Sequence, residues 1–392
     1  MNNIKQISDY VSNIIDDVRK NGDKAIFEYL KKFDNVDLSN SKNGYKIQQK
    51  DINDSVSKLS KLLKRVIKCS YSNVLQYHKY EYSQIKKMWE YKKNGLNIKQ
   101  FHTPVESVGI YVPGGRFAYP STVIMTAIPA IVAGVSRIII VSPPKNINDA
   151  VLFAARLCGI KEIYCIGGAS AIAALAYGTK TLKKVDMIVG PGNIYVSEAK
   201  RQVFGCVGID SIAGPSEVAI IADANVPVDY VVYDIMAQLE HDNMAKAYFL
   251  CESKSKISEV KKKLPSEIFK QLQIELCSLN KAIEMVNNIA PEHLELLVKD
   301  YKDLLKNIKN VGAVFVGYQT PTVFGDYFAG PSHVLPTNGA AKFSSGVSVM
   351  TFLKKFACIR MAKINKNAYR MTADFAQLEN MKYHKKSSEI RI

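Results

Sequence analysis

The chain has 392 residues, of which 47% are hydrophobic and 23% charged, a composition typical of a folded, soluble protein rather than a disordered or fibrous one. A single core stops growing at about 250 to 300 residues, so this length predicts two or more domains. The net charge of +17 is carried mostly by short lysine runs spread along the chain, with no arginine-rich arm and no recognisable RNA or DNA motif. We therefore expect a basic surface and no nucleic acid partner.

The sequence predicts a cytoplasmic protein that does not enter a membrane. No apolar run reaches the roughly 18 residues that a membrane helix needs, and the N-terminus lacks the apolar core of a signal peptide. The seven cysteines are scattered and never form a CxxC pair. This pattern favours buried thiols in a reducing compartment over a disulfide framework or a zinc knuckle.

The first hundred residues are predicted to be mainly helical. From about Ile4 to Asn97, apolar residues recur at three and four residue spacing, as in VSNIIDDVRK and VSKLSKLLKRVIKC. Near Ser107 the pattern changes to short β-branched runs that alternate with helix-like segments, from VGIYVP through RIIIVSPP to VDMIVG. This alternation predicts a doubly wound parallel α/β sheet.

A second α/β unit is predicted after the first. Strand-like EVAIIAD (217–223) precedes helix-like VDYVVYDIMAQLEHD, strand-like KAYFLCES, a lysine-rich helix and strand-like NVGAVFVG. The last 45 or so residues return to a helical pattern and end in a polar, basic tail. The two α/β stretches could be diverged copies of one unit, a question that the sequence alone leaves open.

Two segments carry side chains suited to a metal ion. Gln238 and His241 are three residues apart on a predicted helix, so both project from one face. A polar helix face with one capping histidine is the alternative, and it would be preferred if this segment stood alone. The loop FGDYFAGPSHVLPT adds Asp326 and His333, and loops of this composition place side chains rather than fill cores. A Gln, His, Asp, His set would suit Zn²⁺, with Mn²⁺ or Co²⁺ as substitutes.

The segment NNIAPEHLELLV supplies a candidate acid and base. Pro291 stands at an expected first helical position, with Glu292 and His293 just inside the helix. A helix N-terminus would favour a charged carboxylate and a neutral imidazole, the forms that a general base requires. The alternative is an acidic residue that only complements the helix dipole.

Four of the six histidines, His241, His293, His333 and His384, lie in segments dense with other functional residue types, whereas His78 and His102 are expected to be surface or packing residues.

Two glycine-rich segments could bind a dinucleotide. YVPGGRFAYPST and VGPGNIYVSEAK each follow a predicted strand and precede a predicted helix. Neither is the GxGxxG fingerprint, and either one alone is better explained as a tight turn. Two of them in one α/β unit favour contacts with a pyrophosphate or a ribose.

The order of the motifs resembles histidinol dehydrogenase over nearly the whole chain, from RKNGDKAIFEYLKKFD to the tail. The matching segments are YVPGGR, GGASAIAALAYGT, VGPGN, EAKRQVFG, AGPSEV, QLEHD, APEHLE, GDYFAGPSHVLPT and LENMKYHK. No single motif decides the resemblance, but nine in one order are specific.

The resemblance implies two Rossmann-like doubly wound domains, with limits of 1–110 plus 217–345 for one and 111–216 for the other. Residues 346–392 would form a helical dimerisation tail. The implied enzyme is a homodimer that oxidises L-histidinol to L-histidine through the aldehyde, at the last step of histidine biosynthesis, with two NAD⁺ and one zinc ion per subunit.

The resemblance also assigns site residues. The implied zinc ligands are Gln238, His241, Asp326 and His384, the last from the partner subunit's tail, so each active site needs both chains. The implied histidinol contacts are Ser216, Gln238, His241, His293, Asp326, Glu379 and His384, with His333 close by. The implied NAD contacts are Tyr111, Ser170 and Asn193.

One position departs from the family, which usually has glutamine where this chain has Ser170. The shorter side chain would lose a hydrogen bond to the cofactor or reach it through water, typically at a cost of about 0.5 to 1.5 kcal/mol. In the implied mechanism His293 removes the hydroxyl proton and Glu292 activates a water for the second oxidation. The metal chiefly orients the substrate.

Three other functions remain open. A sister enzyme could oxidise another alcohol, such as a dihydroxypropanesulfonate, but the tail keeps Glu379 and His384, which favours an imidazole-bearing substrate. A zinc hydrolase would leave the two glycine-rich turns without a purpose, and HExxH is absent. A nucleic-acid-binding protein is supported only by the net charge.

Overall fold

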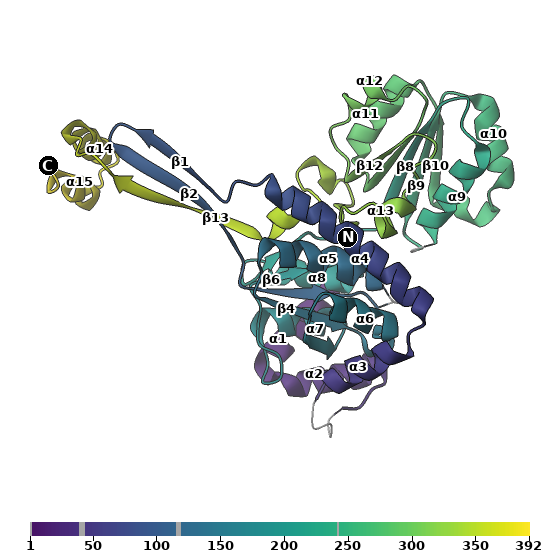
Figure 1. Cartoon of the computed structure of the whole chain (residues 1–392), viewed down its shortest axis with the longest axis horizontal. Helices are drawn as coiled ribbons and strands as arrows, with labels where there is room; N and C mark the ends of the chain where they lie inside the picture. Colours follow the sequence, from purple (N-terminus) through teal and green to yellow (C-terminus); the bar gives the residue numbers. More distant parts are fainter. Residues whose placement is uncertain (1, 39–43, 115–118, 241–242) are drawn as a thin grey trace. The chain divides into compact units, whose positions relative to one another are not determined.

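The computed structural model describes residues 2–38, 44–114, 119–240 and 243–392 (Figure 1). The chain divides into two compact units, of which the first comprises Met1–Tyr82 and Val105–Phe352, and the second Ser83–Pro104 and Leu353–Ile392. The first unit contains both parallel sheets that the sequence predicts, and the second is a three-stranded sheet followed by two helices.

The first unit opens with helices α1 (Asn2–Asn21), α2 (Asp23–Tyr29), α3 (Gln49–Lys58) and α4 (Lys61–Ser83). Its first sheet has the order β5-β4-β3-β6-β7, with all neighbours parallel. The strands are β3 (Ser107–Tyr111), β4 (Arg137–Ser142), β5 (Glu162–Cys165), β6 (Met187–Val189) and β7 (Gly208–Ile209). The connecting helices are α5 (Pro120–Ala133), α6 (Asp149–Leu157), α7 (Gly168–Tyr177) and α8 (Ile194–Val203).

Alternating side chains pack the two faces of this sheet against helices. Tyr111, Ile139 and Val141 share one core with residues of α1, α2, α7 and α8, while α5 packs against β3 and β4 and also contacts α6. The strands are therefore buried on both faces, which explains their nearly continuous runs of Val and Ile. The predicted doubly wound sheet is confirmed.

The second sheet has the order β10-β9-β8-β11-β12 and is also parallel throughout. Its strands are β8 (Glu217–Ala222), β9 (Lys246–Cys251), β10 (Leu272–Leu276), β11 (His293–Leu297) and β12 (Ala313–Val316). Its helices are α9 (Val228–Leu239), α10 (Lys254–Lys263), α11 (Leu279–Ile289), α12 (Lys302–Leu305) and α13 (Val323–Tyr327). Val218, Ile220 and Leu297 face α9 and α10, whereas Leu294 and Leu296 face α11.

Within the segment APEHLELLV, His293–Leu297 form strand β11, so the helix predicted to begin at Pro291 is wrong. His293 to Leu297 are all buried, and they pair in parallel with β8 on one side and β12 on the other. A strand that is buried on both faces is rich in apolar residues. Periodicity alone does not distinguish such a segment from part of a buried helix.

The second unit contains strands where helices were expected. β1 (Met88–Lys93) pairs with β2 (Leu96–Pro104), and β2 pairs with β13 (Leu353–Met361), both antiparallel. Asn94 and Gly95 join β1 to β2 with positive φ angles of 52° and 84°, the conformation that two-residue hairpin turns require. The predicted helical opening region therefore ends at Ser83, and the predicted helical tail begins only with α14 (Lys366–Leu378) and α15 (Lys382–Glu389).

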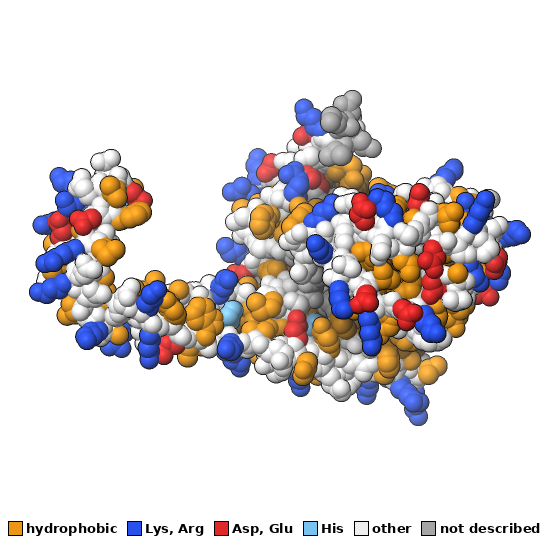
Figure 2. Space-filling model, turned by 90° about the horizontal axis from the view of Figure 1, so that it is seen from above, with side chains coloured by type: hydrophobic (Ala, Val, Ile, Leu, Met, Phe, Trp, Pro, Cys, Tyr) orange, Lys and Arg blue, Asp and Glu red, His pale blue; other side chains and the backbone are white. Residues whose placement is uncertain are grey.

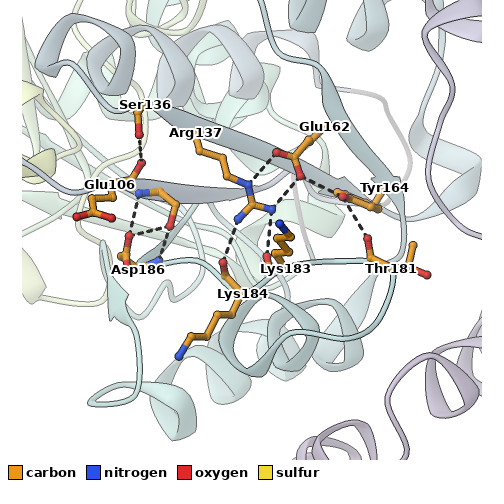
Figure 3. A network of polar contacts seen from close by, with 10 residues as sticks. Glu106, Ser136, Arg137, Glu162, Tyr164, Thr181, Lys183, Lys184 and Asp186 are labelled. Carbon is orange, nitrogen blue, oxygen red and sulfur yellow. Dashed lines mark hydrogen bonds and ion pairs between the residues drawn. The ribbon is translucent and has the colours of Figure 1, made fainter.

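A polar network fixes the amino ends of four strands in the first sheet (Figure 3). Arg137, at the start of β4, donates two hydrogen bonds of 2.8 Å to the Glu162 carboxylate at the start of β5. Ser107, at the start of β3, donates to the Asp186 carboxylate just before β6, from its backbone N–H at 2.9 Å and from its hydroxyl at 2.7 Å. These side chains close the amino edge of the sheet. The glycine-rich turns follow β3 and β6 and therefore lie at the opposite, carboxyl edge.

The surface and the cysteines partly match the expectations. Basic side chains are interspersed with acidic and apolar ones over the face that Figure 2 shows, as expected for a solvated basic surface. No helix in the described ranges combines the length and apolarity that crossing a membrane requires. Cys158 and Cys251 are buried, but the prediction of buried thiols is wrong for Cys69, Cys206 and Cys358, which are exposed.

Candidate active site

The first cavity lies at the carboxyl edge of the first sheet, and its volume is about 540 Å³. Pro143, after β4, and Gly167, after β5, form its floor, and the first turn of α7 contributes Gly168 to Ser170. An added Cβ on Gly167 would lie 2.4 Å from the Pro143 side chain, so glycine is required there. The other lining residues come from α1, from the end of α2 and the π-helix Leu30–Asp34 that follows it, or from the start of α8: Gln6, Ile7, Tyr10, Ile14, Tyr29, Leu30, Phe33, Asp34, Asn193 and Tyr195.

The three predicted NAD contacts meet around this cavity. Ser170 and Asn193 line it. Tyr111 is buried behind it, where the Gly168 N–H donates to the Tyr111 hydroxyl at 3.1 Å. Burial raises the pKa of Tyr111 to about 12, so this hydroxyl stays neutral. The Ser170 hydroxyl donates to the Gly167 carbonyl at 2.9 Å.

A buried ion pair shapes the glycine-rich turn that contains Asn193. Lys200 of α8 is 1% exposed, and its ammonium contacts the Asp210 carboxylate and donates to the Gly190 carbonyl at 3.0 Å. The same carboxylate accepts the Gly190 N–H at 2.7 Å. Gly190 has a φ of 113°, and an added Cβ there would lie 2.2 Å from the Tyr111 carbonyl oxygen. Both backbone polar groups of Gly190 are thus satisfied by one ion pair.

We expect Lys200→Met to lower the free energy of unfolding by about 3 kcal/mol, because breaking a buried pair leaves the Asp210 charge without its cation. Urea denaturation measures the change. Lys5→Met, a substitution of an exposed lysine, serves as the control, and equal stability of the two variants would contradict the expectation.

The second cavity, of about 490 Å³, lies where the carboxyl edge of the first sheet meets the amino edge of the second. The first sheet contributes Pro113 and Gly114 after β3, and Pro191 to Asn193 after β6. The second sheet contributes Ser216 before β8, and Glu292 and His293 at the start of β11. Asn193 lines both cavities, so a ligand of the first lies next to the second.

Glu292 and His293 are buried side by side in the second cavity, with exposures of 8% and 7%. The Glu292 Oε2 atom accepts the Glu217 N–H at 3.2 Å and lies 3.8 Å from the His293 Nδ1 atom. Burial is the main cause that raises the pKa of Glu292 to about 8, and the charges of Asp326 and Glu217 add to the rise. The expected helix N-terminus that would keep this carboxyl charged is absent, because Glu292 precedes a strand.

Two of the four predicted zinc ligands line the second cavity. Gln238, in the last turn of α9, is 5% exposed, and Asp326 lies on the short helix α13. His333 and Ser216 line the same cavity. His241 lies outside the described residues. Within the described ranges no group of three His, Cys, Asp or Glu side chains is placed to hold a metal ion.

Glu379 and His384 belong to the second unit. Glu379 is the C-cap of α14, and His384 lies on α15. Both side chains are exposed. His384 lines a cavity of this unit together with Leu96, Tyr369 and Tyr383.

The cavities also contain residues that the motifs did not indicate. Asp34, at the end of the π-helix Leu30–Asp34, lines the first cavity, whereas Tyr119, Asn243 and Tyr327 line the second. Asp34 stands in a segment with helical periodicity, and no local pattern distinguishes it from a surface carboxylate. Asn243 stands two residues after the predicted ligand His241, and this closeness in the sequence could have indicated it.

Comparison with known proteins identifies the family of the chain. A family model described as histidinol dehydrogenase matches residues 1–392. The histidinol dehydrogenase of Methanococcus maripaludis is 43% identical over 367 residues, which cover 90% of this chain and 85% of the relative. That of Bacillus subtilis is 42% identical over 403 residues, with coverages of 97% and 92%.

Among solved structures, histidinol dehydrogenase from Elizabethkingia anophelis superposes with a TM-score of 0.90 at 34% identity, covering 98% of this chain and 91% of that one. An acetylating aldehyde dehydrogenase from Geobacillus thermoglucosidasius, at a TM-score of 0.50 and 14% identity, shares the fold alone.

Two parallel α/β sheets that enclose a buried acid and an imidazole, together with these likenesses, define the chain as an oxidoreductase of the dehydrogenase class. The chain belongs to the histidinol dehydrogenase family.

Proposed function

We propose that this enzyme oxidises L-histidinol to L-histidine through L-histidinal, with two NAD⁺ and one zinc ion per subunit. The observation that carries the proposal is the second cavity, in which Glu292 and His293 lie among Gln238, Asp326 and Ser216. The family supplies the substrate, and the cavity supplies an acid, a base and polar groups that can orient it.

The lining of the second cavity suits a cation. It includes the carboxyl groups of Glu292 and Asp326, and none of its described residues is a lysine or an arginine, although the chain carries a net charge of +17. Uncompensated acidic groups in a cavity favour a metal ion or a cationic substrate. A zinc ion there would be held by Gln238, His241, Asp326 and, from a second copy of the chain, His384, and it would supply positive charge that orients the substrate.

The proton transfers can be assigned to residues of this chain. Oxidation of the carbinol carbon requires removal of the hydroxyl proton, and His293 accepts that proton; NAD⁺ bound in the first cavity would accept the hydride. For the second oxidation, Glu292 takes a proton from the water that adds to the aldehyde carbon. Its carboxyl must first lose its own proton, which the raised pKa delays to mildly alkaline pH unless bound positive charge lowers that pKa.

The first cavity is the proposed NAD⁺ site. It combines the N-terminal turn of α7, which has no side-chain cap, and the Asn193 amide at the start of α8 with the aromatic side chains of Tyr10, Tyr29 and Phe33. Helix N-termini bind phosphate, and aromatic rings stack on bases. None of the described lining residues is a lysine or an arginine, so the backbone would supply the donors for the pyrophosphate.

We expect Ser170→Gln to lower the KM for NAD⁺ by about two- to tenfold, because the longer amide adds a hydrogen bond that serine does not make. The Ser170 hydroxyl is already used on Gly167. Steady-state kinetics with NAD⁺ varied at saturating L-histidinol measures the change. The KM for L-histidinol is the control, and an unchanged or higher KM for NAD⁺ would contradict the expectation.

A homodimer with shared sites is also proposed. The helices of the second unit expose the large apolar side chains of Met371, Phe375, Leu378 and Tyr383 next to Glu379 and His384. Exposed apolar groups beside candidate ligands are expected if this surface is covered by a second copy. Mixing inactive Asp326→Ala and His384→Ala proteins should restore part of the activity, because a mixed dimer contains one intact site.

The decisive experiment is an anaerobic assay of the zinc-loaded enzyme with L-histidinol, in which NADH is counted per substrate consumed. A ratio near two supports the four-electron oxidation, and a ratio near one restricts the reaction to the alcohol step. A dihydroxypropanesulfonate is the competing substrate. If the enzyme prefers this anionic alcohol, the second candidate function, oxidation of a hydroxylated sulfonate on the same fold, replaces histidinol oxidation.

A further inference from the structure

Two carboxyl groups lie buried together beneath the second cavity, and the proposed mechanism does not use them. Glu295 of β11 is fully buried and Asp234 of α9 is 9% exposed. The two carboxyls lie within hydrogen-bonding reach of each other, and the Glu295 Oε2 atom has no other hydrogen-bond partner in the described part of the chain. No ion pair to either carboxyl is present in the described part of the chain, so this acid pair, Asp234 and Glu295, lacks the cation that usually accompanies buried acids.

The surroundings of the acid pair are apolar. Glu295 lies on the face of β11 that packs against α9, where Val231, Ile235 and Leu297 form the core. Desolvation raises the pKa of both carboxyls, which favours a form with one proton between them. A protonated carboxyl donates to its neighbour in a fixed direction, whereas apolar side chains of the same size would pack without a preferred direction.

The acid pair joins the three elements that carry the proposed site. Asp234 is one helical turn before Gln238 on α9, and Glu295 is two residues after His293 on the same face of β11. The second contact of Glu295 reaches the third element, because its Oε1 atom accepts the Thr322 N–H at 2.7 Å. Thr322 is the N-cap of α13, the helix that carries Asp326.

We infer that Asp234 and Glu295 are positioning residues that hold α9, β11 and α13 in register, so that Gln238, His293 and Asp326 converge on one bound cation and substrate. The inference rests on the proposed function and adds to it the device that fixes the site's geometry. It explains why two carboxyls occupy a core where apolar residues would be more stable.

The test compares removal of the acid pair with its conservative replacement. Glu295→Met keeps the size of the side chain but abolishes both hydrogen bonds, and Asp234→Leu removes the pair from the helix side. Glu295→Gln keeps both contacts, since its amide N–H can donate to Asp234 and its carbonyl can accept from Thr322. Val260→Ala, on α10 in the same core, is the matched control, because it lowers stability without touching the pair.

The main measurement is zinc affinity of the full-length protein by competition with a chromogenic chelator. The KM for L-histidinol, the KM for NAD⁺ and the midpoint of thermal unfolding are measured alongside. We expect Glu295→Met and Asp234→Leu to weaken zinc binding by about 10- to 100-fold, the range typical of groups that orient metal ligands. The KM for L-histidinol should rise in parallel, the KM for NAD⁺ should not change, and Glu295→Gln should restore both values to near wild type.

The inference is overturned if Glu295→Met and Asp234→Leu bind zinc and L-histidinol as the wild type does. It is also overturned if Val260→Ala weakens zinc binding as much as they do, since stability alone would then explain the loss. If neither removal variant folds, Glu295→Gln and Asp234→Asn decide, because a positioning role requires that both keep zinc affinity near wild type. A different result would refute the proposed function itself: the wild-type protein would then neither bind zinc nor form NADH from L-histidinol.

Discussion

His293→Gln should lower kcat by about 10²- to 10⁴-fold for L-histidinol and for L-histidinal, with little change in the binding of either, the range expected when a general base is removed. His293 lines the second cavity at the start of β11, where the pairing of this strand with β8 and β12 fixes its backbone. Glutamine keeps the approximate size and polarity of the imidazole but cannot accept the hydroxyl proton of the alcohol or that of the hydrated aldehyde. The loss should therefore fall on the chemical step.

Single-turnover NADH formation measures that step, and equilibrium binding of L-histidinol to the variant tests whether the site is intact. His102→Gln is the control, because His102 lies on β2 in the second unit and its Nδ1 atom is hydrogen-bonded to the Lys86 carbonyl. Rates near wild type for His293→Gln, with histidinol still bound, would assign the base to another residue.

Glu292→Gln should abolish the oxidation of L-histidinal more completely than that of L-histidinol, by about 10²-fold or more. The reason is that only the second step needs a proton removed from water. Wild-type kcat should rise with pH along a limb set by the ionisation of Glu292, with a midpoint below the metal-free pKa of about 8 because the bound positive charge lowers that pKa, and this limb should be missing from the residual activity of the variant. A limb that persists in Glu292→Gln would belong to a different group.

The same substitution has a second, independent consequence for stability. Because the folded state raises the pKa of Glu292, folding holds this proton more tightly than the unfolded chain does. Wild-type stability should therefore fall as pH rises from the ordinary carboxyl pKa of about 4.5 to about 8, by at most about 1.4 kcal/mol per pH unit. Glu292→Gln should lack this decline, so urea denaturation of the metal-free proteins at pH 5 and pH 9 distinguishes the two.

The parallel sheets could be predicted from the sequence because their strands are buried on both faces. Runs such as RIIIVS and EVAIIA have no other stable environment, and the glycine-rich turns after β3 and β6 mark the carboxyl edge. The hairpin of the second unit was missed, although Asn94–Gly95 is a strong hairpin signal. The lysines and apolar residues around it have a spacing that also fits a helix.

The strand that carries the proposed chemistry was harder to predict for a physical reason. Glu292, His293 and Glu295, at positions i, i+1 and i+3, fit one polar face of a helix, and Pro291 fits a helix start. The Glu295 carboxyl is accommodated on a buried strand because Asp234 of α9 lies beside it. The sequence alone does not predict this contact. The raised pKa of Glu292 depends on burial in the same way.

The connection of β2 to β13 has a consequence during synthesis. β1 and β2 leave the ribosome early, whereas β13 follows only after nearly all of both parallel sheets has been made. Until then the outer edge of β2 presents free backbone donors and acceptors that could recruit a foreign strand. Nascent chains halted before Leu353 should therefore aggregate more readily than finished ones, even though their parallel sheets are complete.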